Sequence, residues 1–177
     1  MNNPFTLIST KHIYDNPWIS VREESVEKWG RNGIFWIVTM KNGTCILVLD
    51  DANNVLLSRE YKYALWRDDI NLPGGAMDDG ESPLDCAKRE MEEEIGYIAE
   101  EWISLGYIHP LTTLLEQTEN LFLARKLTKT QVHEDEWENI HLIKLPYTTV
   151  LEMVMNSEIS HWASVVAILK AQKYIIS

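Results

Sequence analysis

One stretch organises the chain: GAMDDGESPLDCAKREMEEEIGY, from Gly75 to Tyr97. Its second half predicts a helix over residues 83–95. Ser82 stands at the N-cap, Pro83 takes the first helical position, and Gly96 ends the helix because glycine tolerates a positive φ. At about 100° per residue, one narrow arc of this helix is apolar and is expected to be buried. That arc holds Leu84, Ala87, Met91 and Ile95.

Three carboxylates share a neighbouring arc of the same helix. Glu90, Glu93 and Glu94 are related by i, i+3 and i, i+4 spacing. Carboxylates on one ridge repel each other unless a cation sits among them. Hard oxygen ligands suit Mg²⁺, or Mn²⁺ as an alternative, and Mg²⁺ also binds substrate phosphates. These three glutamates are therefore predicted metal ligands, whereas Glu92 points to the other side and is expected to be a solvated surface charge.

The spacing of this stretch resembles the signature of the Nudix hydrolases. That pattern is Gly, five residues, Glu, seven residues, Arg-Glu, an aliphatic residue, any residue, Glu-Glu, any residue, Gly and an aliphatic residue. Every fixed position is filled here, and Tyr97 departs from the pattern only at the last apolar position. The residues that carry the match are Gly75, Glu81, Arg89, Glu90, Glu93, Glu94 and Gly96.

The resemblance implies a hydrolase that cleaves a nucleoside diphosphate linked to another moiety. It also implies an α/β (α+β) fold, an α/β/α sandwich around a mixed β-sheet. It adds Gly74 to the metal ligands, gives Glu93 a catalytic role as well, and makes Arg89 a residue that orients the glutamates. The competing interpretation is an acidic surface helix or an inactive copy of the fold, because a motif match is a hypothesis.

Composition and charge exclude some classes of binding partner. The chain has 177 residues, of which 45% are hydrophobic, enough for a real core. Its net charge of −11 repels nucleic acid polymers, although a small anionic nucleotide remains a possible substrate if metal ions offset the charge. We expect no signal peptide and no membrane partner, since no apolar run approaches the roughly 20 residues of a bilayer span. Cys45 and Cys86 lack ligand spacing, and both are expected to be reduced in a cytoplasmic protein.

Short strands and turns fill the rest of the chain. Strands are expected within residues 5–29, broken at Asn16-Pro17, and over residues 34–41, after a turn at 30–33. Asn42-Gly43 predicts a hairpin, and residues 44–50 and 55–61 predict a second one. Beyond the helix we expect strands over 102–109, 120–127 and 140–145 and then two helices. The chain is expected to divide into an N-terminal β extension, residues 1–42, and a Nudix domain, residues 43–177.

Features outside the signature resemble the ADP-ribose pyrophosphatase branch of the family. They are Asn16-Pro17-Trp18, the run of residues 59–63 ahead of residues 72–75, and the ending from residue 140 to residue 171. Asn71 departs from the branch, which commonly has glutamate before Leu-Pro, and residues 111–117 lack the glycine that is often found there. The prediction is therefore hydrolysis of a nucleoside diphosphate sugar, with ADP-ribose as the first candidate.

An acidic loop is the predicted source of the catalytic base. Glu134, Glu136 and Glu138 alternate ahead of residue 140. The branch places a catalytic glutamate in this loop, so Glu136 or Glu138 is the predicted base. The alternative is a solvated mobile loop.

The predicted substrate-binding residues are an arginine and two tryptophans. Guanidinium groups bind diphosphates. The resemblance favours Arg59 over Arg67, for which surface solvation is the alternative. Trp36 and Trp66 are predicted to stack on substrate, although burial in a core or a dimer contact is the commoner fate of a tryptophan.

A homodimer is predicted from the N-terminal extension. This apolar, strand-rich segment carries Trp18, Trp29 and Trp36 and would otherwise leave edges and aromatic surface exposed. In the ADP-ribose branch this region pairs between subunits and helps to build the substrate site. Two further functions stay open: a nucleoside triphosphate pyrophosphatase that removes damaged nucleotides, and a nucleotide-binding sensor that does not cleave its ligand.

Overall fold

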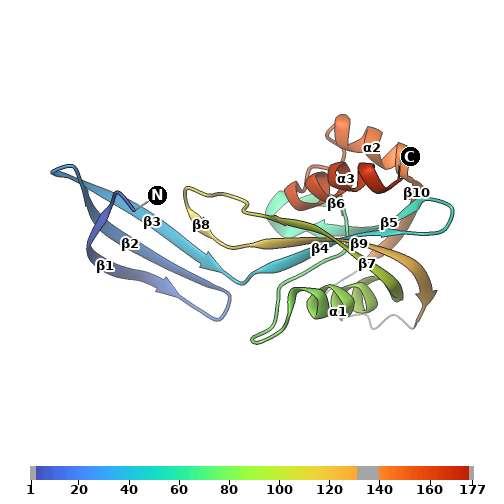
Figure 1. Cartoon of the computed structure of the whole chain (residues 1–177), viewed down its shortest axis with the longest axis horizontal. Coiled ribbons are helices and arrows are strands. Elements are labelled where there is room, and N and C mark those ends of the chain that lie inside the picture. Colours follow the sequence, from blue (N-terminus) through green and yellow to red (C-terminus); the bar gives the residue numbers. More distant parts are fainter. Residues whose placement is uncertain (1–2, 131–139, 176–177) are drawn as a thin grey trace. The chain divides into compact units, whose positions relative to one another are not determined.

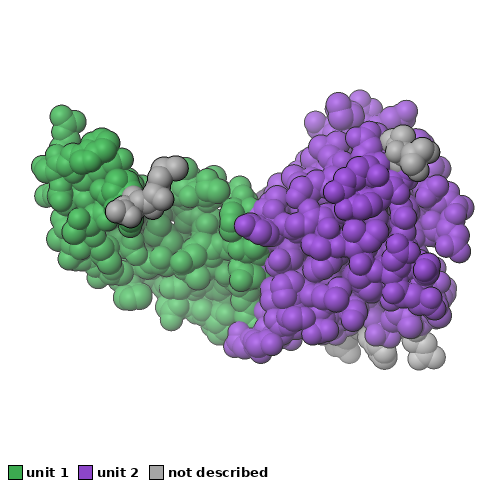
Figure 2. Space-filling model, in the orientation of Figure 1, with its two compact units in different colours: residues 1–42, 109–118 green, residues 43–108, 119–177 purple. Residues whose placement is uncertain are grey.

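A computed structural model describes residues 3–130 and 140–175 of the chain. The chain divides into two compact units, which are coloured separately in Figure 2. The first unit comprises residues up to 42 together with residues 109–118, and the second comprises residues 43–108 with residues from 119 onward. The short segment 109–118 was not assigned to the N-terminal extension from the sequence. Each unit is described by itself below.

The second unit is a mixed sheet between helices. Its strand order is β10-β5-β4-β9-β7, with β6 also paired to β5; β4 and β9 are parallel, and the other pairs are antiparallel. Helix α1 lies on one face of the sheet, and α2 and α3 lie on the other (Figure 1). The predicted sandwich around a mixed sheet is therefore confirmed. The elements are β4 (Gly43–Leu49), β5 (Asn54–Lys62), the 3₁₀ turn η1 (Tyr63–Leu65), β6 (Arg67–Asn71), α1 (Pro83–Ile95), β7 (Tyr97–Ile108), β9 (Glu119–Lys129), β10 (His141–Pro146), α2 (Tyr147–Met155) and α3 (Trp162–Ile175).

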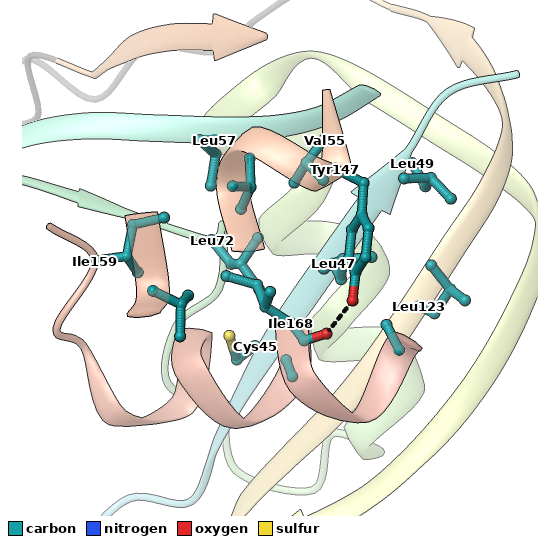
Figure 3. Close-up of a cluster of buried hydrophobic side chains, with 14 of the residues drawn as sticks. Cys45, Leu47, Leu49, Val55, Leu57, Leu72, Leu123, Tyr147, Ile159 and Ile168 are labelled. Carbon is teal, nitrogen blue, oxygen red and sulfur yellow. Dashed lines mark hydrogen bonds between the residues drawn. The ribbon is translucent and has the colours of Figure 1, made fainter. Parts of the chain in front are cut away.

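Strand β4 is the central strand and is buried along its whole length. Because successive side chains of a strand point to opposite faces, it contributes to two hydrophobic clusters. Leu47 and Leu49 pack in the cluster beneath α2 and α3, which Figure 3 shows, and Ile46 and Val48 pack in the cluster beneath α1. A continuous apolar run is what a strand covered on both faces requires.

Helix α1 has the predicted bounds and caps. The Ser82 hydroxyl accepts a hydrogen bond from the Asp85 amide at 3.2 Å, and Gly96 closes the helix with φ 67°. Ala87, Met91 and Ile95 are buried as predicted, and Leu84 packs at the margin of their cluster. The capping signals and the apolar spacing lie within one short segment of the chain, which is why the sequence alone located this element.

The first unit is a small, mostly exposed sheet of strands β1 (Thr6–Asp15), β2 (Ile19–Lys28), β3 (Arg31–Met40) and β8 (Leu115–Glu116). The turn between β2 and β3 is Trp29-Gly30, with φ 53° and 74°, and not residues 30–33 as predicted. A two-residue hairpin turn of this kind needs positive φ at both central positions. Val26 is its one buried apolar residue among those described, whereas Trp18 and Trp29 are 71% and 84% exposed.

The hairpin predicted at Asn42-Gly43 is wrong. Strand β3 pairs with β2 and β8, and β4 pairs with β5 and β9, so the chain leaves one sheet here and enters another. The Asn42 side chain instead accepts a hydrogen bond from the Thr118 amide at 2.8 Å. A Cβ on Gly43 would lie 2.5 Å from the Glu119 carboxylate. The dipeptide that is typical of a tight turn therefore serves close packing against other segments.

No helix of the described ranges 3–130 and 140–175 is long and apolar enough to cross a membrane.

Candidate active site

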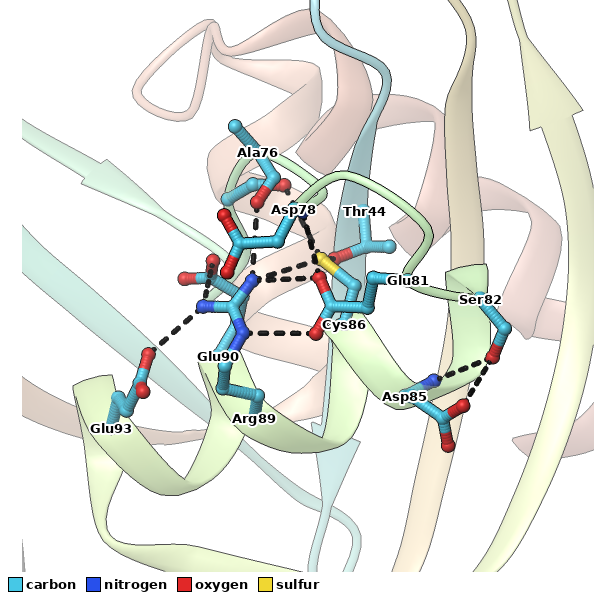
Figure 4. A network of polar contacts seen from close by, with 11 residues as sticks. Thr44, Ala76, Asp78, Glu81, Ser82, Asp85, Cys86, Arg89, Glu90 and Glu93 are labelled. Atoms are coloured by element: carbon cyan, nitrogen blue, oxygen red, sulfur yellow. Dashed lines mark hydrogen bonds and ion pairs between the residues drawn. The ribbon is translucent and has the colours of Figure 1, made fainter.

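Arg89 forms ion pairs with acidic side chains of α1 and of the loop before it (Figure 4). Its Nε and Nη2 atoms each lie 3.0 Å from a carboxylate oxygen of Glu81, and its Nη1 lies 2.8 Å from Glu90 and 3.0 Å from Glu93. Nη2 also donates to the Ala76 carbonyl at 3.1 Å. The hydrogen bonds from Arg89 lower the pKa of Glu81 to about 2, and those contacts also raise the pKa of the guanidinium. One cation thus offsets three carboxylates and holds them on one side of the helix.

The loop before α1 is fastened to β4 and to the glutamates. Backbone hydrogen bonds of 2.9 Å run from Thr44 to Gly75 and from Ile46 to Pro73. The Gly74 amide donates to the Glu94 carboxylate at 3.3 Å. A Cβ on Gly74 would lie 2.0 Å from the Thr44 carbonyl oxygen, and one on Gly75 would lie 2.4 Å from the Glu90 carboxylate, which would have to move. Glycine is therefore required at position 74, where the loop passes against the backbone of β4.

The predicted metal ligands suit a hard divalent ion in their chemistry. Glu90, Glu93, Glu94 and the backbone of Gly74 offer only oxygen donors, and the Glu90 side chain is 13% exposed whereas that of Glu93 is 49% exposed. Within residues 3–130 and 140–175, no three acidic, histidine or cysteine side chains form a ready-made ion site. Magnesium is usually held by one or two carboxylates with water and substrate phosphates, so a complete protein cage is not required.

The predicted substrate residues have other contacts than those of the Arg89 network. Arg59 is an exposed residue of β5, paired with Ile70 and His141 across the sheet. Trp66 ends the turn η1 with a left-handed backbone, is 71% exposed and packs on Tyr63 with ring centroids 4.9 Å apart. Trp36 belongs to the first unit, where its indole N–H donates to Glu23 at 3.0 Å. The predicted bases, Glu136 and Glu138, fall outside the described residues.

Glu119, an alternative to the loop glutamates as the catalytic base, is buried, which the sequence did not predict. It opens β9, is 8% exposed and packs its carboxylate against Gly43. Desolvation raises the pKa of Glu119 to about 7. A single glutamate before an apolar strand carries no motif, so the burial of Glu119 follows only from the pairing of β9 with β4.

Cys86 of α1 is a second buried titratable group. Burial raises the pKa of its thiol to about 11, and the thiol contacts Arg89 at 3.5 Å.

The buried Glu119 carboxyl should make stability depend on pH. An acid whose folded pKa is raised from 4.5 to about 7 binds its proton in the folded state when the unfolded chain has already lost it. Its contribution is fully present below pH 4.5 and is lost as the pH rises to 7, by up to about 3 kcal/mol. Urea unfolding at pH 5 and pH 8 should show Glu119→Gln gaining stability over wild type as the pH rises. Glu100→Gln, on the exposed side of β7, is the matched control; an equal difference at both pH values for Glu119→Gln would contradict the expectation.

Fold and site together define a hydrolase with an acidic helix beside a glycine loop. A NUDIX domain model matches residues 39–171, most of the chain, and the protein therefore belongs to the Nudix family. The chain is 24% identical over 157 residues to the ADP-ribose pyrophosphatase of Bacillus subtilis (strain 168), covering 86% of this chain and 84% of that protein.

Two further comparisons extend this relationship. The chain is 40% identical over 57 residues to a putative 8-oxo-dGTP diphosphatase of the same organism, which covers 32% of this chain and 36% of that protein. A crystal structure of an ADP compounds hydrolase has a TM-score of 0.86 at 18% identity and covers 98% of this chain and 95% of its own. That likeness supports the fold.

Proposed function

We propose that the protein hydrolyses the diphosphate of a nucleoside diphosphate sugar in the presence of Mg²⁺, with Mn²⁺ as an alternative ion. The products are a nucleoside monophosphate and a sugar phosphate, and ADP-ribose is the first candidate substrate. The observation that carries the proposal is the ridge of Glu90, Glu93 and Glu94, held by Arg89 and by the glycine loop. The extended likeness to an ADP-ribose pyrophosphatase supports this choice of substrate.

Each residue of the site is proposed to hold the metal, to orient a metal ligand or to contact the substrate. Glu90, Glu93, Glu94 and Gly74 would hold the metal, which supplies Lewis-acid chemistry and lowers the pKa of water when bound. Arg89 keeps two of these carboxylates oriented through hydrogen bonds of 2.8 and 3.0 Å. The Gly74 amide orients Glu94. Arg59, Trp36 and Trp66 are proposed to contact the substrate.

Substrate and metal are tested together by product analysis. We expect ADP-ribose to yield AMP and ribose phosphate with Mg²⁺, and we expect excess chelator to stop the reaction, since the metal supplies the charge stabilisation. Turnover that survives the chelator would contradict the metal requirement. Comparing the rates of hydrolysis of nucleotide sugars, dinucleoside polyphosphates and nucleoside triphosphates identifies the substrate class.

A nucleoside triphosphate pyrophosphatase is the second candidate. The 57-residue match to a putative 8-oxo-dGTP diphosphatase favours it. The two functions differ in their products, because a triphosphate substrate releases inorganic pyrophosphate. Preferred release of pyrophosphate from a triphosphate in the same panel would replace the first proposal with the second.

The catalytic base is proposed to be Glu136, with Glu138 as the second choice, and both residues lie outside the described ranges. Gln at the base should lower kcat by about 10²-fold or more, with a smaller effect on KM, because a general base acts in the chemical step. Single Gln variants at 134, 136 and 138, assayed under saturating substrate, identify the base. Values within a few-fold of wild type for all three would remove the base from this loop.

The homodimer also remains a proposal. Its support is the exposed aromatic surface of the first unit, where Trp18, Trp29 and Trp36 are 71%, 84% and 57% exposed. Large apolar side chains exposed in this number on one small sheet are typical of interaction surfaces in soluble proteins. A solution mass of a single chain at micromolar concentration would contradict it.

A further inference from the structure

One hydroxyl is buried in the apolar face that α3 turns toward the sheet. It belongs to Ser164, which is fully buried. The other buried residues of this helix are all apolar: Ala163, Ala167, Ile168 and Ala171. A buried hydroxyl costs stability unless its hydrogen-bonding groups are satisfied. The partners of Ser164 therefore indicate what this hydroxyl contributes.

The first partner of Ser164 lies at the start of the glycine loop, residues 72–75. The Leu72 amide, one residue beyond the end of β6, donates to Ser164 Oγ at 3.0 Å. Leu72 is itself buried and packs with Cys45 in the cluster beneath α2 and α3 (Figure 3). Because little water reaches this buried amide, the Ser164 hydroxyl is the acceptor that satisfies it.

The second partner orients the hydroxyl. Nδ1 of His161, the residue before α3 begins, lies 2.9 Å from Ser164 Oγ. Burial lowers the pKa of His161, and nearby Lys62 lowers it further, whereas Asp69 raises it. A neutral imidazole that carries its proton on Nε2 accepts the Ser164 hydrogen at Nδ1, which leaves the lone pairs of Oγ for the Leu72 amide. In this tautomer His161 fixes the direction from which Ser164 accepts.

The glycine loop is held from both faces of the sheet. Backbone hydrogen bonds from β4 reach the loop on either side of Gly74, and the Glu94 carboxylate of α1 accepts from the Gly74 amide. Ser164 holds Leu72 from the opposite face, because α3 covers the face of the sheet that α1 does not (Figure 1). The helix that carries no predicted metal ligand thus contacts the loop that carries one.

A displacement of Leu72 would be passed on to Gly74. The two residues are at most about 7 Å apart along the backbone, and Pro73 between them has a restricted φ. At Gly74 the backbone passes so close to β4 that a Cβ would lie 2.0 Å from the Thr44 carbonyl oxygen. Little rotation is therefore left to absorb the displacement, and the Gly74 amide would move relative to Glu94.

We infer, resting on the hydrolase function proposed above, that Ser164 is a positioning residue for the metal site and acts through the Leu72 amide on Gly74 and Glu94. Gly74 and Glu94 are proposed metal ligands, so the ion binds best to a loop that already has its bound geometry. Groups that orient metal ligands by hydrogen bonds contribute to metal affinity. Loss of the Ser164 hydroxyl should therefore weaken metal binding in addition to lowering stability.

Titration of the substrate-free protein with Mn²⁺, followed by the electron paramagnetic resonance of the free ion, measures this effect without turnover. Ser164→Ala should weaken Mn²⁺ binding about tenfold, because the Leu72 amide loses its acceptor. The matched control is Ile168→Val, which shortens a buried side chain of the same helix that cannot hydrogen-bond the loop. This control should bind Mn²⁺ within about twofold of wild type. Unchanged Mn²⁺ binding in Ser164→Ala, or an equal loss in both variants, would overturn the inference.

Amide hydrogen exchange of the metal-free protein separates this inference from the proposed hydrolysis. In Ser164→Ala the Gly74 amide should exchange about tenfold faster relative to the buried Leu123 amide of β9, because the loop opens locally more often. A loss of global stability alone would not raise this ratio. A wild type that binds no Mn²⁺ would contradict the proposed function and leave the exchange ratio to decide the inference. An unchanged ratio would overturn the inference even if the protein cleaves its substrate.

A second variant covers the case in which Ser164→Ala does not fold. His161 is only partly buried, and His161→Leu removes the Nδ1 acceptor while keeping a side chain that packs against apolar groups. This variant should raise the exchange ratio of Gly74 to Leu123 about threefold or more, because the Ser164 hydroxyl loses its fixed orientation. With no folded Ser164→Ala to measure, an unchanged ratio in His161→Leu would overturn the inference.

Discussion

Glu94→Gln should lower kcat on the order of 10³-fold while leaving the fold intact. The carboxylate is proposed to hold the metal, whose charge stabilisation contributes several kcal/mol to the transition state. Gln keeps the shape of the side chain and can still accept the hydrogen bond that Gly74 donates to Glu94 at 3.3 Å. Turnover at saturating Mg²⁺ and substrate, with circular dichroism to check the helix, measures the effect.

Glu92 supplies the matched control on the same helix. Glu90→Gln should behave like Glu94→Gln, whereas Glu92→Gln should change kcat by no more than a few-fold. The Glu90 side chain is 13% exposed beside Arg89, whereas none of the contacts of Arg89 with described residues involves the Glu92 side chain. Comparable losses at positions 92 and 94 would contradict the assignment of the acidic ridge to one face of α1.

Arg89→Lys should cost both activity and stability, although the charge is retained. The guanidinium reaches Glu81 with two hydrogen bonds and Glu90 and Glu93 with one each, which an ammonium on a single stem cannot do. Glu81 and Glu90 are 15% and 13% exposed, so leaving them poorly paired should cost about 2 kcal/mol and lower Tm by roughly 5 °C. We expect kcat/KM to fall about 10²-fold, since the misplaced carboxylates are the proposed metal ligands.

A double-mutant cycle with Glu81→Gln isolates the pairing at Arg89. The two substitutions remove the same contacts, so their effects on the free energy of unfolding should not add. Lys88→Arg, at the exposed neighbouring position, controls for the exchange of one cationic side chain for another on the helix. Fully additive effects of Arg89→Lys and Glu81→Gln would show that the ion pair contributes nothing to stability.

The sequence by itself determined α1 and its chemistry because the signals are local. Ser82, Gly96 and the apolar positions act over one to four turns of one helix, and the structure has the helix at residues 83–95 as predicted. The fixed offsets from Gly75 to Gly96 likewise identified the family before any packing was known. The buried strands followed from their apolar runs, which is why the mixed sheet and its helices were predicted correctly.

Only the tertiary structure decided which segments meet. Asn42-Gly43 looks like a hairpin turn in sequence, yet Gly43 lies beside Glu119 in a parallel strand pair. Nothing in the sequence marks Glu119, Asp69 and Asn71 as buried. They are buried because β9 pairs with β4 and β6 pairs with β5. Strand pairing joins residues distant in sequence, and the preference for one partner over another comes from the summed burial of whole strands. A window of neighbouring residues does not contain that information.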